Sequence, residues 1–238
     1  MKTTDNAVEL AVLQEQVIAC RKCPRLVEYR EKIAREKRRA YRDCEYWGKP
    51  VPSFGDPQAR VLIIGLAPGA HGSNRTGRMF TGDGSGNFLY RVLHATGFAS
   101  QPAAVSRDDG LELRDLYITA AVRCAPPGNK PTPQEFAKCR PYLERELELL
   151  RNVRVVVTLG RMGHDAYLGI LQDQGKIGRR SQYPFGHGVA HKLPKGLPLL
   201  VSSYHPSQQN TQTGKLTEAM FRKVFERVRR ALGTAGRR

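Results

Sequence analysis

The stretch VLIIGLAPGAHGSNRTGRMFTGDGSGNFLYRVL, residues 61–93, decides the fold of this chain. It begins with a continuous apolar run, residues 61–64, of the kind that forms a strand buried on both faces of a parallel sheet. It ends with the apolar spacing of an amphipathic helix, at Phe88, Leu89, Val92 and Leu93. Between the two lies a long glycine-rich loop, and long loops inside a compact domain are usually functional. In an open parallel sheet such a loop lies at the carboxyl ends of the strands, where ligands bind.

The composition of this loop indicates what it binds. Its glycines begin at Gly65, Gly69 and Gly72, which is not the dinucleotide spacing, and no Gly-Lys-Ser/Thr follows, so we expect no nucleotide cofactor. A turn without a ligand is the simpler alternative. We favour a binding loop, because it gathers polar side chains around one isolated aromatic ring: His71, Asn74, Arg75, Arg78 and Asp83 around Phe80. A ring among hydrogen-bonding groups suits a flat heterocycle.

The rest of the chain predicts an α/β fold. Apolar runs at residues 116–122, 154–159 and 199–203 are further strands, and the segments 133–150, 160–170 and 216–232 read as helices. At the N-terminus we expect a helix over residues 8–27, closed by Pro24, and then a basic helical run over residues 28–43. Strands that alternate with helices predict a single domain, residues 1–238, with a central four-stranded parallel sheet in a three-layer α/β/α sandwich.

The charge of the chain predicts a polyanionic partner. The 238 residues carry 39 Lys and Arg against 22 Asp and Glu, a formal net charge of +17. Such an excess usually indicates nucleic acid. The alternative is a coding bias towards arginine. Residue by residue, the basic run at residues 28–43 is better explained as a solvated helix face, although as a patch it could contact phosphates.

The same composition bears on location. No apolar run is long enough to span a bilayer, and the N-terminal residues lack the apolar core of a signal peptide. The five cysteines are an odd number, which argues against a secreted disulfide framework. We therefore expect a cytoplasmic protein with no membrane partner.

Four of the cysteines suggest a metal centre. Cys20 and Cys23 form a tight pair, whereas Cys124 and Cys139 lie far apart in sequence. Zinc ribbons usually use two tight pairs, and iron–sulfur clusters accept wider separations. The spacing alone leaves zinc and an iron–sulfur cluster about equally open, with unligated buried thiols as a third possibility. Cys44 fits neither pair.

Three segments resemble one known family. They are GLAPGAHGSNRTGRMFTGDGSG, LYITAAVRCAPPGNKPTP and SYHPSQQNTQTGKLT. Together they resemble the family 5, or UDGb-type, uracil-DNA glycosylases, which are related to the family 4 iron–sulfur enzymes. The resemblance covers nearly the whole chain. It implies a uracil-DNA glycosylase fold, a [4Fe-4S] cluster on Cys20, Cys23, Cys124 and Cys139, and excision of uracil, and also of hypoxanthine or xanthine, to leave an abasic site in DNA.

Two positions depart from better-known uracil glycosylases. Ala67 stands where those enzymes place a catalytic Asp or Asn, and Ala120 stands where family 4 has an Asn that reads the uracil edge. A water-activating acid must then come from elsewhere, and base recognition should be looser.

The chemistry of N-glycosidic hydrolysis suggests roles for the remaining residues. The base is flipped out, the sugar becomes cationic and negative charge moves onto the leaving base. Phe80 offers a stacking face, His205 could donate a hydrogen bond to the base, and Asp83 could orient water or stabilise the cation. Asn129 could assist. The simpler alternatives are a backbone-bonded histidine, a helix cap at Asp83 and a turn asparagine.

The full set of expected site residues follows. The catalytic residues are Asp83, Asn129 and His205; the substrate pocket comprises Gly65, Ala67, Gly69, His71, Phe80, Ala120 and His205; the DNA contacts are Arg75, Arg78, Ser207, Gln208 and Asn210. We expect a monomer. The rival interpretations are a non-catalytic, metal-stapled nucleic-acid-binding module and an enzyme that acts on free nucleotides, for which the net charge of +17 would be unusual.

Overall fold

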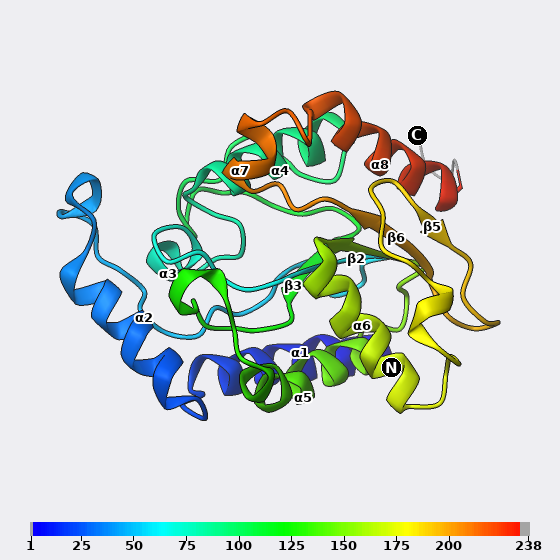
Figure 1. The fold of residues 1–238 in the computed structure, drawn as a ribbon, viewed down its shortest axis with the longest axis horizontal. Helices are drawn as coiled ribbons and strands as arrows, with labels where there is room; N and C mark the ends of the chain where they lie inside the picture. Colours follow the sequence, from blue (N-terminus) through cyan, green and yellow to red (C-terminus); the bar gives the residue numbers. More distant parts are fainter. Residues whose placement is uncertain (1, 234–238) are drawn as a thin grey trace.

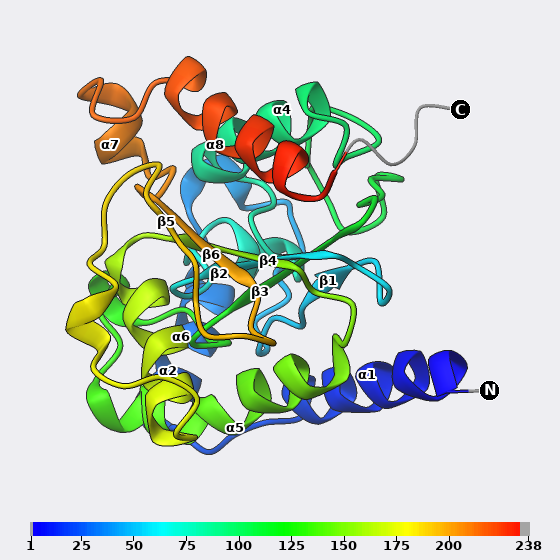
Figure 2. The ribbon, with the colours of Figure 1, turned by 90° about the vertical axis from the view of Figure 1, so that its right-hand side faces the viewer.

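The centre of the molecule is a sheet that is mostly parallel. The computed structural model describes residues 2–233, with side chains from residue 6. Six strands pair in the order β1-β3-β2-β4-β6-β5; Figure 1 shows the fold, and Figure 2 labels all six strands. The four inner strands are parallel, as predicted: β2 (Val61–Gly65), β3 (Leu116–Ala120), β4 (Val155–Leu159) and β6 (Leu199–Ser203). The sheet also has two antiparallel edge strands, β1 (Phe54–Gly55) and β5 (Ala190–His191), which the sequence did not predict because two residues show no periodicity.

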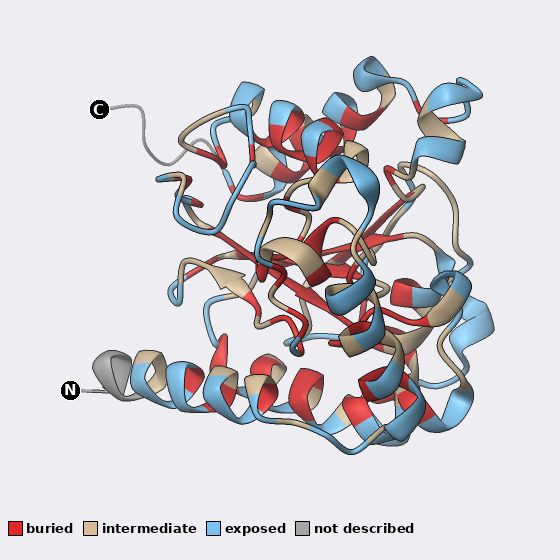
Figure 3. Ribbon diagram, turned by 90° about the vertical axis from the view of Figure 1, so that its left-hand side faces the viewer, coloured by how far each residue is buried: buried red, intermediate tan, exposed pale blue. Residues whose placement is uncertain are grey.

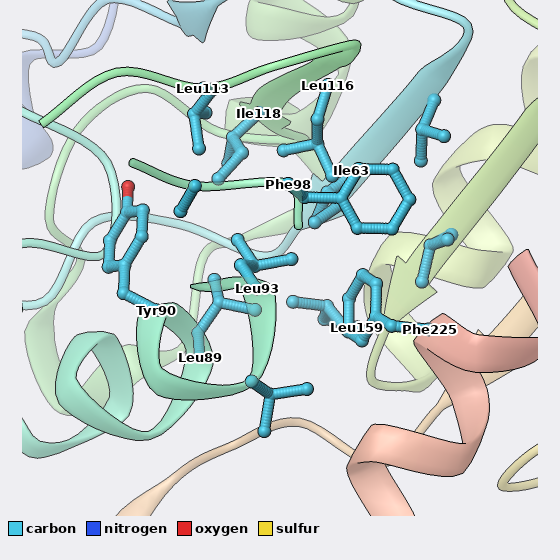
Figure 4. Close-up of a cluster of buried hydrophobic side chains, with 14 of the residues drawn as sticks. Ile63, Leu89, Tyr90, Leu93, Phe98, Leu113, Leu116, Ile118, Leu159 and Phe225 are labelled. Atoms are coloured by element: carbon cyan, nitrogen blue, oxygen red, sulfur yellow. The ribbon is translucent and has the colours of Figure 1, made fainter. Parts of the chain in front are cut away.

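Helices cover both faces of the sheet. Because successive side chains of a strand point to opposite faces, β2 gives Ile63 to one apolar core and Ile64 to the other. The first core is covered by α4 (Gly84–Ala95) and α8 (Glu218–Ala231); Figure 4 shows Leu93 and Phe225 of these helices facing the sheet. The second is covered by α1 (Lys2–Ile18), α5 (Pro133–Leu149) and α6 (Arg161–Asp173), whose inner faces are buried (Figure 3). The predicted three-layer sandwich is confirmed.

The N-terminal segment differs from the prediction. Instead of one helix over residues 8–27, α1 ends at Ile18 and α2 (Pro24–Glu36) begins at Pro24. A proline fits the first turn of a helix, where its missing N–H needs no partner, so Pro24 opens a helix rather than closing one. Cys20 and Cys23 lie in the resulting break. The basic run leaves the helical conformation after Glu36 and continues as a short 3-10 helix, η1 (Arg39–Tyr41).

The strand order reverses between β2 and β4, and we call the region beyond the carboxyl ends of these two strands the crevice. From β2 the chain crosses to β3 on one side, and β4 and β6 then lie on the other side. Loops that leave β2 and β4 therefore diverge, and such a switch point is where open α/β sheets bind ligands. Short helices in the loops are α3 (Ser73–Thr76), η2 (Pro127–Asn129), η3 (Arg180–Gln182) and α7 (Gln208–Gln212). Within residues 2–233, no helix is long and apolar enough to cross a membrane.

Candidate active site

Two aromatic rings meet in the crevice between β2 and β4. The ring centres of Phe80 and His205 are 5.8 Å apart, with planes inclined by 32°. Glycines at the strand ends make room for them. A Cβ on Gly65 would lie 3.0 Å from the Phe80 ring, and a Cβ on Gly160 would lie 3.3 Å from Cβ of His205. Both residues were expected in the substrate pocket, and the fold brings their rings together although 124 residues separate them.

The backbone holds Phe80 in an unusual conformation. Its φ is +52°, in the left-handed region that non-glycine residues rarely adopt. The first turn of α4 packs against its carbonyl group, because a Cβ on Gly86 would lie only 1.7 Å from Phe80 O. Backbone strain of this kind costs on the order of 1–3 kcal/mol and tends to occur at functional sites. The strain fixes the direction of the one aromatic ring in the loop.

His205 follows β6 and is neutral. Burial lowers the pKa of its imidazole to about 4. The side-chain amide of Asn210 donates a hydrogen bond to the His205 carbonyl at 2.9 Å, and Ser207 caps α7 by accepting from the Asn210 amide. Ser207 and Asn210 thus hold the histidine segment in place. A neutral imidazole with one N–H can donate a hydrogen bond to an oxygen of a leaving base.

Asp83 is a helix cap, as the simpler alternative suggested, and it is also buried. It is the N-cap of α4, with Oδ1 accepting from the Gly86 amide at 2.9 Å. Its other oxygen, Oδ2, lies against the opposite side of the loop, where a Cβ on Gly69 would approach it to 2.9 Å. Burial raises the pKa of the Asp83 carboxyl, although hydrogen bonds from the amides of Gly86 and Ser85 oppose this shift. The carboxylate is therefore both a cap and a desolvated acid facing the glycine loop.

Other expected pocket residues line the ends of β2 and β3. Gly65 pairs with Ala120, which is buried, and Ala67 packs against the second apolar core. His71 hydrogen-bonds through Nδ1 with the Tyr46 hydroxyl at 3.1 Å. Burial lowers the pKa of His71, as do the neighbouring charges of Arg38 and Arg75.

The two loop arginines mainly stabilise the loop itself. Arg78 is buried and pairs through both terminal nitrogens with Asp109, each at 2.8 Å. The predicted phosphate contact of Arg78 is therefore wrong, because its charge is neutralised away from the surface. Arg75 donates to the carbonyls of His71 and Gly82 and stacks 4.0 Å above the Tyr41 ring. Arg75 remains partly exposed, so a DNA contact through its second terminal nitrogen is still sterically open.

Asn129 and Gln208 lie at the rim of this edge. Asn129 ends η2 with φ +57° and is exposed, and its side chain makes no hydrogen bond with any described residue. It is a left-handed turn residue, as the simpler alternative suggested. The side chain of Gln208 lies over the N-terminus of α4, because a Cβ on Gly84 would come within 2.9 Å of its amide nitrogen. The structure brings Phe80 and His205 together and places Asp83 at the start of α4, facing Gly69, whereas the Asn129 side chain makes no hydrogen bond with any described residue.

Four cysteines lie together beneath the loop. Cys20, Cys23, Cys124 and Cys139 line a common pocket, whereas Cys44 lies outside it. None of them forms a disulfide. Within the described residues, no three Cys, His, Asp or Glu side chains come close enough to ligate a single metal ion. The four thiols therefore share one pocket without a disulfide among them.

Two buried arginines flank this pocket. Arg30 points a terminal nitrogen at Cys124 Sγ, 3.9 Å away, and the Arg123 amide donates to Cys139 Sγ at 3.3 Å. The Nε atoms of Arg30 and Arg123 are buried without a hydrogen-bond partner among the described residues. Arg30 also accepts, through its carbonyl, a hydrogen bond from the buried Asn74 of the glycine loop at 3.2 Å. The sequence analysis missed this role of Arg30, because its basic run gave no sign that one arginine of the run turns inward.

Gly160 is the other residue that the sequence analysis missed in the crevice. It follows β4 directly, has φ +87° and faces His205. A glycine at the end of an apolar run does not by itself indicate a site residue. Gly160 is recognised as one only because the strand order places it at the switch point, next to His205.

Comparison with known proteins agrees with this geometry. The model of the uracil DNA glycosylase superfamily matches residues 52–229. The chain is 54% identical over 220 residues to a type-5 uracil-DNA glycosylase of Thermus thermophilus, covering 92% of this chain and 96% of the relative. It is 49% identical over 229 residues to a type-5 uracil-DNA glycosylase of Mycobacterium leprae, covering 96% and 98%. A type-4 uracil-DNA glycosylase of Sulfurisphaera tokodaii is 27% identical over 220 residues, covering 91% and 84%. The chain therefore belongs to the type-5 uracil-DNA glycosylases of the uracil DNA glycosylase superfamily.

Proposed function

We propose that this protein is a DNA repair enzyme that hydrolyses the N-glycosidic bond of uracil, and also of hypoxanthine and xanthine, in DNA. The observation that carries the proposal is the meeting of Phe80 and His205 in the crevice, with ring centres 5.8 Å apart. A base flipped out of the helix needs a stacking face and a hydrogen-bond donor in one enclosed place. The crevice offers both at the carboxyl edge of the sheet.

The reaction assigns a part to each group. Water bonds to C1′ of the sugar through its oxygen and loses one proton to solvent, and the base leaves with the electrons of the C1′–N bond and then takes up a proton from solvent. His205 donates its N–H to an oxygen of the departing base, which stabilises the charge that develops there. Since burial keeps the pKa of His205 near 4, the ring acts as a neutral donor at neutral pH. Asp83 is the acid that faces the sugar, where its negative charge stabilises the cationic sugar and its oxygen orients the water. Asn129 has no part in this step, because it is an exposed turn residue whose side chain makes no hydrogen bond with any described residue.

The small side chains of the pocket support the wider range of bases. Ala120 ends β3 with a methyl group, and Gly65 beside it has no side chain. Neither can donate or accept a side-chain hydrogen bond that would select the edge of uracil. Stacking on Phe80 and a single donor from His205 are compatible with any oxygen-bearing deaminated base.

One experiment tests this proposal. Duplexes with a single uracil, hypoxanthine or xanthine are incubated with the protein, and abasic sites are then cleaved with alkali. Cleavage at all three bases is the expected result, and cleavage at uracil alone would restrict the proposal to uracil. Tight binding without cleavage at any base would instead favour the non-catalytic binding module.

We further propose that Cys20, Cys23, Cys124 and Cys139 hold a [4Fe-4S] cluster. Their side chains line one pocket, and a cluster with four thiolates is negatively charged. The buried Arg30 beside Cys124 would compensate that charge. When bound, the cluster would tie the break between α1 and α2 to the segment after β3. Iron and sulfide analysis should find about four of each per chain, and stoichiometric zinc in a colourless protein would overturn the assignment.

We also propose a binding partner, an oligomeric state and a cellular compartment. The partner is DNA, and we expect the protein to be a monomer. We expect it to work in the reducing cytoplasm, because all five cysteines are free. Binding should weaken by about 0.9 log units per contacted phosphate for each tenfold rise in salt. A flat salt dependence would mean that the excess of arginine reflects coding bias, and light scattering during size-exclusion chromatography would show the oligomeric state.

A further inference from the structure

A strip of aromatic side chains leads away from the crevice on the β6 side. Tyr204 precedes His205 in sequence, and its ring stacks on that of His187, with centres 5.1 Å apart and planes inclined by 25°. Phe185 lies beyond, with its ring centre 6.3 Å from that of Tyr204. All three residues remain partly exposed. We call Phe185, His187 and Tyr204 the aromatic strip.

The pairing of β5 with β6 holds the strip at the carboxyl edge. The Gly188 amide donates to the Ser202 carbonyl at 2.8 Å, which pins the loop before β5 to the end of β6. Nδ1 of His187 accepts a hydrogen bond from the Tyr204 amide at 3.4 Å. Figure 2 shows this loop rising beside the segment that connects β6 to α7. The strip therefore lies on the same edge of the sheet as the candidate active site.

Cations cover the rings of the strip. The guanidinium of Arg161 lies 5.5 Å from the centre of the Phe185 ring, and Nζ of Lys215 lies 5.0 Å from that of Tyr204. Both side chains belong to exposed residues. Long exposed side chains can move to phosphates and leave the ring faces to bases, since contacts of this kind contribute only about 0.5–1 kcal/mol at exposed sites.

A basic hollow adjoins the strip. Its floor includes His187 and Val224, and its rim carries three cations of α8, namely Lys223, Arg227 and Arg230. Its one acid, Glu226, pairs with Arg222 at 3.4 Å, and Arg227 donates to the Gly188 carbonyl. The side chains of Lys223 and Arg230 make no hydrogen bond or ion pair with the residues that the structure describes. We call the hollow with these three cations the basic hollow.

From this juxtaposition we propose that the aromatic strip and the basic hollow form a binding site for a single-stranded segment of DNA next to the flipped nucleotide. Non-specific single-strand sites combine a positively charged groove for the phosphates with aromatic rings on which bases stack. An intact duplex keeps its bases stacked on each other and so cannot use the rings, and an acidic protein surface would need the cations but not the rings. The inference deepens the proposed function, because it names unpaired DNA as the form that this side of the site accepts.

The test uses DNA without any target base, so that it does not depend on excision. The affinity for a fluorescein-labelled single strand without uracil is measured by anisotropy at several salt concentrations, with the corresponding duplex in parallel. Phe185→Leu removes a stacking face but keeps an apolar side chain, and Lys223→Gln removes one exposed charge. Lys195→Gln is the matched control, because Lys195 is exposed in the turn between β5 and β6, at the opposite edge of the sheet.

We expect the three variants to differ in their affinity for the single strand and in its salt dependence. Phe185→Leu should weaken single-strand binding by about 5- to 100-fold, the range for loss of one stacked base, and should leave duplex binding nearly unchanged. Lys223→Gln should lower the salt slope for the single strand by about 0.7, and Lys195→Gln should have no effect. Unchanged single-strand affinity in both strip and hollow variants, with unchanged melting temperatures, would overturn the proposal. So would equal losses for single strand and duplex in the Phe185 variant.

Excision from a uracil duplex, measured on the same samples, keeps the two proposals apart. If the wild-type protein binds the single strand through the strip but excises nothing, the proposed function fails and the binding site stands. If it excises uracil and the variants bind like wild type, the binding site fails and the proposed function stands.

Discussion

Replacing Asp83 by asparagine separates catalysis from stability. The carboxylate caps α4 through a 2.9 Å hydrogen bond from the Gly86 amide, and an asparagine oxygen can accept that bond equally well. The substitution also removes the negative charge of Asp83. That charge is unfavourable in the folded state, because burial raises the pKa of the carboxyl. Any stabilisation from such a group is present only below its unfolded-state pKa and is lost as pH rises through the folded-state pKa. At neutral pH the charge therefore costs the folded protein free energy, and Asp83→Asn should not lower the melting temperature.

The expected loss of rate is large by comparison. If Asp83 faces the cationic sugar, asparagine removes its negative charge from a site that is shielded from water. Loss of one preorganised electrostatic group commonly slows the chemical step by about 10²- to 10³-fold. Asp83→Ala should be as slow, and should also lose the cap, which contributes about 1 kcal/mol. For a chain of this size, that loss corresponds to a fall of about 2–4 °C in melting temperature.

The assay is single-turnover excision from a uracil duplex with enzyme in excess, beside melting curves and DNA affinity for each variant. Asp56→Asn is the matched control, because Asp56 also accepts a backbone hydrogen bond, from Gln58 at 2.8 Å, but lies before β2 at the opposite edge of the sheet. The control should excise at the wild-type rate. Full activity of Asp83→Asn at an unchanged melting temperature would refute the reasoning and leave Asp83 as a helix cap.

Three further predictions follow from the same geometry. As Asp83 ionises, the single-turnover rate should rise with pH, with a midpoint above the ordinary aspartate pKa of about 3.9. The rate should not fall between pH 6 and 8, because the donor His205 is already neutral there. A fall near pH 6.5 would indicate that the donor is a protonated histidine. Glu146→Gln should destabilise the protein by about 3–5 kcal/mol in urea unfolding, because it leaves the charge of Arg123 buried without its counterion; a loss below about 1 kcal/mol would contradict this. Gly69→Ala should slow excision with little change in melting temperature, since its Cβ would displace the Asp83 carboxylate; a wild-type rate would show that this contact does not position the acid.

Local patterns in the sequence were sufficient to predict the parallel sheet and its covering helices. The apolar runs of β2, β3, β4 and β6 show burial on both faces, and only a parallel sheet covered by helices accounts for several such runs. The glycine-rich loop after β2 indicated the position of the site for the same reason, because parallel strands end at one edge. The failure at Pro24 shows the limit of such patterns, since a proline can end one helix or open the next.

Only the tertiary structure decided the geometry of the site. The sequence does not distinguish Arg75 from Arg78, since both are arginines of the same loop. Arg78 is buried because Asp109, 31 residues further along the chain, pairs with it. Arg30 is likewise one basic residue among many until α2 packs beside Cys124. The composition of the glycine-rich loop and the needs of the reaction made Phe80, Asp83 and His205 candidates, and the strand order brought Phe80 and His205 together. The physical reason is that apolar periodicity and glycine content act through the local backbone, whereas burial of a charge or contact between two rings depends on which distant segments the fold brings together.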